Sequence, residues 1–224
     1  MINLLFLQAD LIHLYSFTVI IYKILEENSS KGVSSKIFEI YLLVFFIRYF
    51  EIFIIYTSLY DKIIAIFFIG VNIIILYLVR INKKYSNDYD RSKDDNFPYM
   101  YLILFAFFMT IFINKDYSFL GLTSSFSLWL ESVAVFPIIP IIIKSSERLG
   151  YLPNYLGALC FYKFFHIIYL IYIYASYLTL YWDSIFSTGL QILIYIDFFF
   201  IYFKYINQYI NNDLPLVSRN QIHV

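Results

Sequence analysis

Ionisable side chains interrupt the apolar stretches of this sequence, and they are the residues best able to do chemistry in it. His13, Arg48, Glu131 and Lys163 stand in four separate stretches. An ionisable group in hydrocarbon costs about 2.5–3.5 kcal/mol on insertion scales, so such a group faces the interior of a helix bundle and usually has a function there. These residues therefore mark a buried polar site.

Two of these residues are cations, and two suggest proton exchange. As unpaired cations at mid-depth, Arg48 and Lys163 predict an anionic ligand. His13 lies on the stretch expected to face Glu131, and a buried histidine near a carboxylate is the usual proton switch. The residue types thus predict a site that binds an anion and responds to pH.

Purely structural roles remain open for the other polar residues of the apolar stretches. Glu51 lies three positions after Arg48 on the same helix face and can simply neutralise it. Asp197 can likewise be a structural partner in the last stretch, and His166 a satisfied interior histidine. Asp10 can belong either to the site or to the membrane interface.

Sequence patterns of enzymes are absent. There is no glycine-rich phosphate loop, no pair of catalytic carboxylates and no set of histidines at metal-ligand spacing. The single cysteine, Cys160, has no nearby partner for nucleophilic chemistry and excludes an internal disulfide. We expect neither an enzyme nor a bound cofactor or metal.

The composition shows what kind of fold holds such residues. Of 224 residues, 61% are hydrophobic and 14% are charged, with a mean hydropathy of +0.71. Soluble domains are about 45–50% apolar and about 25% charged. The 16 Lys and Arg balance the 16 Asp and Glu, so no basic excess is present to hold nucleic acid. The chain is expected to be a polytopic membrane protein.

Seven apolar stretches approach the roughly 20 residues that a membrane-spanning helix needs. They cover residues 4–24, 37–57, 63–79, 98–113, 119–143, 155–178 and 185–203. The longest connection, residues 80–97, is too short for a soluble domain. The sequence thus predicts one all-α membrane domain over residues 1–224, with a short tail at 205–224.

An internal repeat is indicated by the second and sixth stretches. They read LVFFIRYFEIF and LCFYKFFHII, each with a cation among aromatic residues and a second ionisable residue three positions later. Two parallel three-helix repeats, at about 1–80 and 119–204, joined by a linker helix at 98–113, are a plan known among transporters. In such folds the ligand lies between the repeats.

The basic residues of the connections predict the orientation in the membrane. With the N-terminus in the lumen, the opposite side holds twelve of the sixteen Lys and Arg, and the lumenal side only Lys62 and Lys115. This asymmetry predicts a lumenal N-terminus and a cytosolic C-terminus.

Several segments are specific enough to indicate a family. The chain resembles the KDEL receptors in its opening NLLFLQADLIHL, in VSSKIFEIYLLVFFIRYFEIF with YTSLY after it, and in SLWLESVAVFP, ALCFYKFF and IDFFFIYF. These receptors return escaped lumenal proteins from the Golgi to the endoplasmic reticulum. The resemblance covers nearly the whole chain and implies an architecture similar to that of the SWEET sugar transporters.

The resemblance also assigns roles to residues. It implies that Arg48 meets the terminal carboxylate of a bound Lys-Asp-Glu-Leu or His-Asp-Glu-Leu signal, with Lys163 and Tyr162 beside it. His13 and Glu131 fall on the family's conserved histidine and glutamate, which implies pH sensing and coupling.

Two acids complete the resemblance. Glu51 stands where the family usually has aspartate and is expected to take part in the coupling. Asp197 matches an aspartate followed by aromatic residues and is expected to be structural or to serve trafficking.

This sequence departs from the family at several positions. Lysine replaces arginine at Lys163, which loses a bidentate fork for a carboxylate. Gly121 and Ser124 replace the glutamate and tryptophan that read the first residue of the signal, and Phe6 and Ile173 replace two further arginines. We therefore expect loose selection of that first residue.

The resemblance implies a receptor for C-terminal retrieval signals in the endoplasmic reticulum and cis-Golgi membranes. Its implied partners are the C-terminal tetrapeptides of lumenal proteins, vesicle coat proteins in the cytosol and membrane lipids, and not nucleic acid. Two alternatives stay open: a transporter of an anionic solute or sugar on the same scaffold, and a trafficking adaptor that has lost peptide binding.

Overall fold

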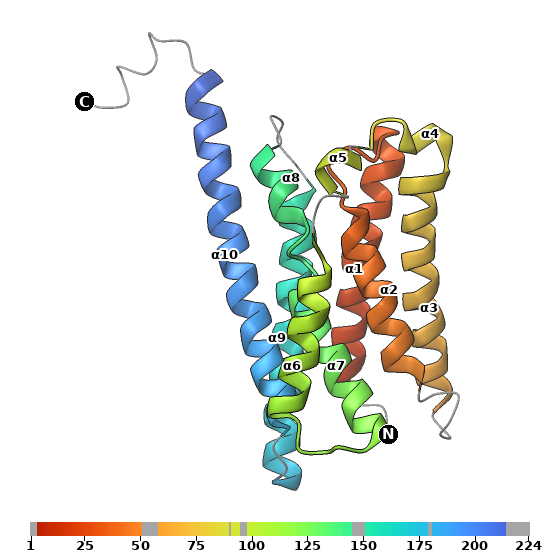
Figure 1. The fold of residues 1–224 in the computed structure, drawn as a ribbon, viewed down its shortest axis with the longest axis vertical. Helices are drawn as coiled ribbons and strands as arrows, with labels where there is room; N and C mark the ends of the chain where they lie inside the picture. The colour runs from red at the N-terminus through yellow and green to blue at the C-terminus, as the bar shows by residue number, and fades with distance from the viewer. Residues whose placement is uncertain are drawn as a thin grey trace, which may run out of the picture.

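The computed structural model describes residues 4–50, 58–89, 91–94, 98–144, 151–178 and 181–213, which form helices and short connections without any strand (Figure 1). The longer helices are α1 (Leu4–Glu27), α2 (Ser35–Tyr49), α3 (Leu59–Leu76), α6 (Met100–Ile113), α7 (Phe119–Val133), α9 (Leu152–Tyr177) and α10 (Trp182–Asp213). The short ones are α4 (Lys83–Ser86), α5 (Arg91–Asp94), α8 (Ile138–Lys144) and the π-helical turn η2 (Tyr77–Ile81). Each predicted apolar stretch overlaps one of the longer helices, although residues 51–57 of the second stretch lie outside the described part of the chain.

Local sequence signals set several helix ends. Ser58 and Asp61 form a capping box at the start of α3, in which each side chain accepts from the other's backbone N–H. The Ser118 hydroxyl caps α7 by accepting from the N–H of Gly121. The predicted fifth stretch is divided, because α7 ends at Val133 and a turn with Pro137 precedes α8.

Four helical segments among the described residues are long and apolar enough to cross a membrane. They are Leu59–Ile81, Phe119–Ile142, Leu152–Tyr177 and Trp182–Lys204, and Met100–Ile113 is a shorter apolar helix. Phe107, Phe108 and Phe112 on α6 are all more than half exposed, as suits a surface that faces lipid. The structure therefore supports a polytopic membrane protein, and the crossing by all seven stretches stays a prediction.

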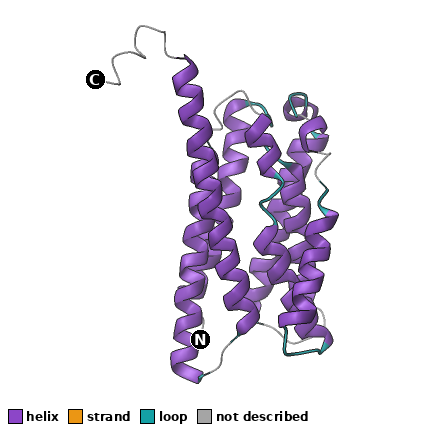
Figure 2. Cartoon of the chain, turned by 60° about the vertical axis from the view of Figure 1, so that its left-hand side comes forward, coloured by secondary structure: helices purple, strands orange, loops and turns teal. Residues whose placement is uncertain are grey.

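The longer helices run side by side along the length of the molecule (Figures 1 and 2). In one half α3 packs against both α1 and α2, and in the other α10 packs against both α7 and α9. Between the halves, α1 packs against α9 and α2 against α7. The first helix of each half thus meets the second helix of the other.

A buried carboxylate fastens the connection after α3 to the start of α2. Asp94 on α5 accepts from the Ser34 hydroxyl at 2.5 Å, from the Ser35 backbone N–H at 2.7 Å and from the Lys36 backbone N–H at 3.3 Å. Tyr89 also donates its hydroxyl to Asp94. Burial and then this bond raise the pKa of Tyr89, which keeps the phenol protonated as a donor.

Candidate functional site

A fully buried carboxylate, Glu131 on α7, lies between two cations. Its Oε2 atom is 2.5 Å from Nη2 of Arg48 on α2, and its Oε1 atom is 3.0 Å from Nζ of Lys163 on α9. Arg48 also donates from Nε to the hydroxyl of Ser127, one turn before Glu131 on α7, at 3.2 Å. Three helices meet at this carboxylate, and the two cations exceed it by one positive charge.

The two cations differ in how far they are buried. The Lys163 side chain is only 2% exposed, whereas the Arg48 side chain is 20% exposed. The Lys163 ammonium lies 4.6 Å from the centre of the Tyr162 ring and 3.5 Å from its hydroxyl oxygen. Arg48 is therefore the member of this ion cluster that an entering molecule reaches first.

His13 on α1 is buried in an aromatic cage beside the ion cluster. Its ring stacks on Tyr162 with 4.1 Å between centroids and 13° between planes, and Phe17 and Phe68 each lie 5.0 Å away. Its Nε2 atom is buried and has no hydrogen-bond partner among the described residues. Tyr162, on which the His13 ring stacks, adjoins Lys163 in the sequence and so connects His13 to the ion cluster.

The site joins the two halves of the molecule. Arg48 and Lys163 come from the second helix of each half, and His13 and Glu131 from the first. Because α1 packs on α9 and α2 on α7, these side chains converge at the boundary between the halves. This is the position in which folds built from parallel repeats bind their ligands.

The structure corrects one sequence interpretation and leaves others as they were. Arg48 and Lys163 are not unpaired, because Glu131 engages both. Glu51 lies outside the described residues, so its pairing with Arg48 stays a prediction. Asp197 is exposed on the outer face of α10 and is not part of the ion cluster.

Two further residues flank the site. Asp10, on α1, is buried and accepts a hydrogen bond from the hydroxyl of Tyr60 on α3 at 2.7 Å, which links the two helices. The ring of His166 lies 6.3 Å from that of Tyr162, and its Nε2 atom is buried without a partner in the described part of the chain. Asp10 thus has a structural bond, and His166 is a second histidine near the ion cluster.

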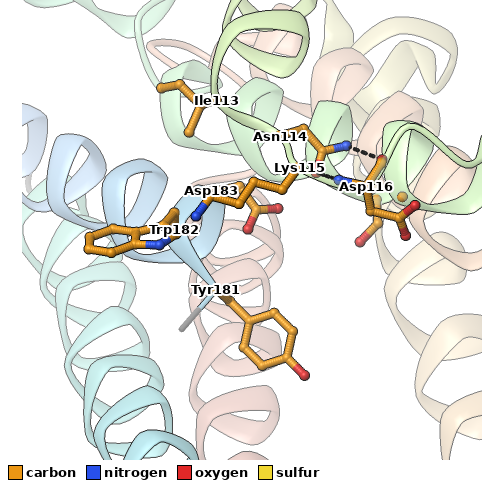
Figure 3. A pocket seen from close by; sticks show the side chains of 9 residues that line it. Ile113, Asn114, Lys115, Asp116, Tyr181, Trp182 and Asp183 are labelled. Atoms are coloured by element: carbon orange, nitrogen blue, oxygen red, sulfur yellow. Dashed lines mark hydrogen bonds between the residues drawn. The ribbon is translucent and has the colours of Figure 1, made fainter. Parts of the chain in front are cut away.

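A cavity of about 250 Å³ opens where α6 gives way to α7 and α10 begins (Figure 3). It is lined by Ile113, Asn114, Lys115, Asp116, Gly121, Ser124, Tyr181, Trp182 and Asp183. Figure 3 shows Lys115 reaching toward Trp182, and its Nζ lies 5.5 Å from the centre of the indole ring. Gly121 and Ser124, two positions at which the resemblance implied a departure, therefore lie in a cavity with acids and aromatic rings.

Sequence reasoning missed several residues of this region. Ser127 was visible one turn before Glu131, but serine is common in helices and gave no distinct signal. Asp116 and Trp182 are 66 positions apart and only the fold brings them to one cavity. The aromatic cage around His13 was hidden among 25 Phe and 24 Tyr.

Comparison with known proteins gives a consistent result. The family model described as ER lumen protein retaining receptor matches residues 29–173. The chain is 33% identical to the ER lumen protein-retaining receptor of Kluyveromyces lactis, over 91% of this chain and 94% of the relative. It is 31% identical to proteins of the same name from Plasmodium falciparum, over 89% and 91%, and from Petunia hybrida, over 90% and 94%.

Proposed function

This chain belongs to the ER lumen protein-retaining receptor family, and we propose that it retains lumenal proteins by binding their C-terminal signals between its two halves. The membership confirms the resemblance to the KDEL receptors. The chain is thus a multi-pass membrane receptor of the endoplasmic reticulum and Golgi. Retrieval from Golgi to endoplasmic reticulum is the function that best fits its site.

We propose the finer architecture from the same observations. All seven apolar stretches cross the membrane as two three-helix repeats, one of α1, α2 and α3 and one of α7, α9 and α10, with α6 as the linker, in a SWEET-like arrangement. The reciprocal packing of α1 on α9 and α2 on α7 supports this, because a two-fold axis along the bundle produces such a pattern. The charge asymmetry supports a lumenal N-terminus and a cytosolic C-terminus, where coat proteins would bind.

One observation carries the binding proposal: Glu131 pairs with both Arg48 and Lys163, and these three described side chains together carry one surplus positive charge. A peptide's terminal carboxylate supplies the missing negative charge. Arg48 is partly exposed and can receive it, with Lys163 and Tyr162 behind. Charged residues at this depth are costly unless they are balanced, so binding an anion stabilises the site.

The proposed pH response follows from the position of His13. Protonation of His13 adds a second surplus positive charge beside the ion cluster, through its stacking on Tyr162. An anionic ligand favours that protonated state, so by linkage affinity falls as pH rises. Capture in the more acidic Golgi and release in the endoplasmic reticulum would then follow.

Binding of a C-terminal tetrapeptide library to the purified protein at about pH 6 and about pH 7.4 tests this function. We expect peptides with a free carboxyl group to bind, more tightly at the lower pH, and an Arg48→Ala variant to lose that binding. Proteoliposomes distinguish a transporter, which would move an anionic solute or sugar across the bilayer. Transport, or failure of every tetrapeptide to bind, would contradict a retrieval receptor.

A further inference from the structure

The outer side of the contact between α1 and α9 carries a groove of about 400 Å³. It is lined by Ile12 and Tyr15 of α1 and by Pro153, Asn154, Gly157, Ala158 and Phe161 of α9. The aromatic side chains Tyr15 and Phe161 are both more than half exposed, and so are Leu11 and Phe164 beside them. In a membrane protein such an apolar surface faces lipid, so the groove opens toward the bilayer.

One end of the groove lies near the end of the bundle and the other lies deeper. The Tyr151 hydroxyl donates to the Gly32 carbonyl oxygen at 2.7 Å, which places the start of α9 beside the connection that follows α1. Asn154 belongs to the first turn of α9, whereas Phe161 follows two turns later. At 1.5 Å per helical residue, Pro153 and Phe161 are about 12 Å apart along the axis. The groove therefore runs from the end of the bundle toward the middle of the bilayer.

The polar groups of the groove suit a neutral head group. The described residues that line it carry no charge, and the exposed amide of Asn154 lies at its outer end. This amide both accepts and donates, so it can bind a hydroxyl group in either direction. Lys23, two turns beyond Tyr15 on α1, is engaged by Glu27 at 3.1 Å. A neutral lipid with a hydroxyl group therefore matches this lining better than a phospholipid, whose phosphate needs a cation.

The floor of the groove is hollow at Gly157. A Cβ atom added there would meet nothing within 4 Å beyond its own stretch of helix. Glycine is less favourable than alanine inside a helix, and neither a close contact nor a positive φ requires it at this described position. The floor thus has room for a molecule from the membrane. A rigid ring system loses less conformational entropy between the rings of Tyr15 and Phe161 than a flexible acyl chain does.

From these features we propose that the groove binds a membrane sterol, with its hydroxyl group at Asn154 and its fused rings over Gly157. Tyr15 and Phe161 pack against the two edges of the rings, one from each helix. The sterol enters from the leaflet at which α1 ends and α9 begins, which is cytosolic in the proposed orientation. This inference goes beyond the proposed function, because it needs α1 and α9 to lie in the membrane but does not need peptide binding.

The groove lies directly outside the part of the interface that carries the buried histidine. Ile12 and Phe161, which line the groove, immediately precede His13 and Tyr162, whose rings stack with 4.1 Å between centroids. A sterol in the groove contacts both helices at this level. It therefore holds together the two helices that connect His13 to the ion cluster.

Photocrosslinking in lipid nanodiscs tests the inference. The full-length protein is placed in phosphatidylcholine nanodiscs with a photoreactive sterol, and mass spectrometry of its peptides locates the label. We expect label on the groove-lining parts of α1 and α9, and competition by unlabelled cholesterol. Asn154→Leu removes a hydrogen bond and should weaken this competition roughly two- to tenfold. Gly157→Leu fills the floor and should reduce the labelling about fivefold or more.

Gly70→Leu is the matched control, because a Cβ atom at Gly70 on α3 also meets nothing within 4 Å and lies outside this groove. It should leave the labelling unchanged. Thermal unfolding in sterol-free nanodiscs checks that each variant folds, and the exposed Asn154 provides the test if Gly157→Leu does not.

Three results would overturn the inference. One is absence of label from the groove, and another is full labelling in both folded variants. The third is equal labelling of the groove by a photoreactive phosphatidylcholine, which would assign it to acyl chains in general. Binding of C-terminal tetrapeptides is measured on the same samples, so the proposed function can stand when this inference fails.

Discussion

The Oε2 atom of Glu131 lies 2.5 Å from Nη2 of Arg48, so the guanidinium already faces a carboxylate of the protein. An incoming carboxylate has to share Arg48 with Glu131 or take it over. Because Glu131 is fully buried and also engages Lys163, any such exchange alters the contacts of three helices at once. Ligand binding and rearrangement of the bundle are thereby coupled.

Glu131→Gln should destabilise the protein. The change removes the carboxylate that pairs with both Arg48 and Lys163, and breaking a buried ion pair costs about 3–5 kcal/mol. Thermal unfolding of the purified protein in detergent measures this. Glu39→Gln is the control, because Glu39 pairs with Arg80 at a partly exposed position and should contribute at most about 1 kcal/mol. Equal losses of stability in the two variants would show that the ion cluster stabilises the bundle no more than a partly exposed ion pair does.

Lys163→Arg should strengthen binding of a free peptide carboxyl group and leave binding of the amide unchanged. A guanidinium can donate two parallel bonds to a carboxylate, which an ammonium cannot do. A charge-assisted bond of this kind contributes about 1.5–3 kcal/mol, so a gain of roughly tenfold to a hundredfold is expected. Isothermal titration with acid and amide forms of one peptide checks this. The idea fails if both forms gain equally.

His13→Phe should remove the pH dependence of binding, whereas His166→Phe should keep it. Phenylalanine preserves the stacking on Tyr162 but cannot take up a proton. One linked proton changes affinity by at most about 25-fold between pH 6 and pH 7.4, with tighter binding at pH 6. Peptide affinity measured across this range in both variants decides between the histidines. An unchanged profile in His13→Phe would assign the proton to another group.

The sequence predicted the helices of this fold better than the contacts between them. Apolar length located the longer helices, because a helix in lipid has to satisfy its own backbone. The cost of burying charge singled out His13, Arg48, Glu131 and Lys163, which the structure brings to one region.

Partners across helices could not be read from local spacing. The pattern paired Arg48 with Glu51 on its own helix, whereas the described contacts join Arg48 to Glu131 on α7. The cavity was missed for the same reason, because Asp116 lies between α6 and α7 and Trp182 at the start of α10, and only tertiary packing brings them together. The break after Val133 was signalled by Pro137, but apolar length alone concealed it.

The bonds of Asp94 decide where a reporter protein can be inserted for imaging this receptor in cells. The segment from Tyr89 to Asp94 lies in the most polar connection of the chain, and its polarity makes it resemble a replaceable surface loop. Yet it holds the first turn of α2 through backbone and hydroxyl bonds, so an insertion there would loosen the helix that bears Arg48. Asn87 and Asp88, which are exposed and precede Tyr89, offer a junction that leaves those bonds in place.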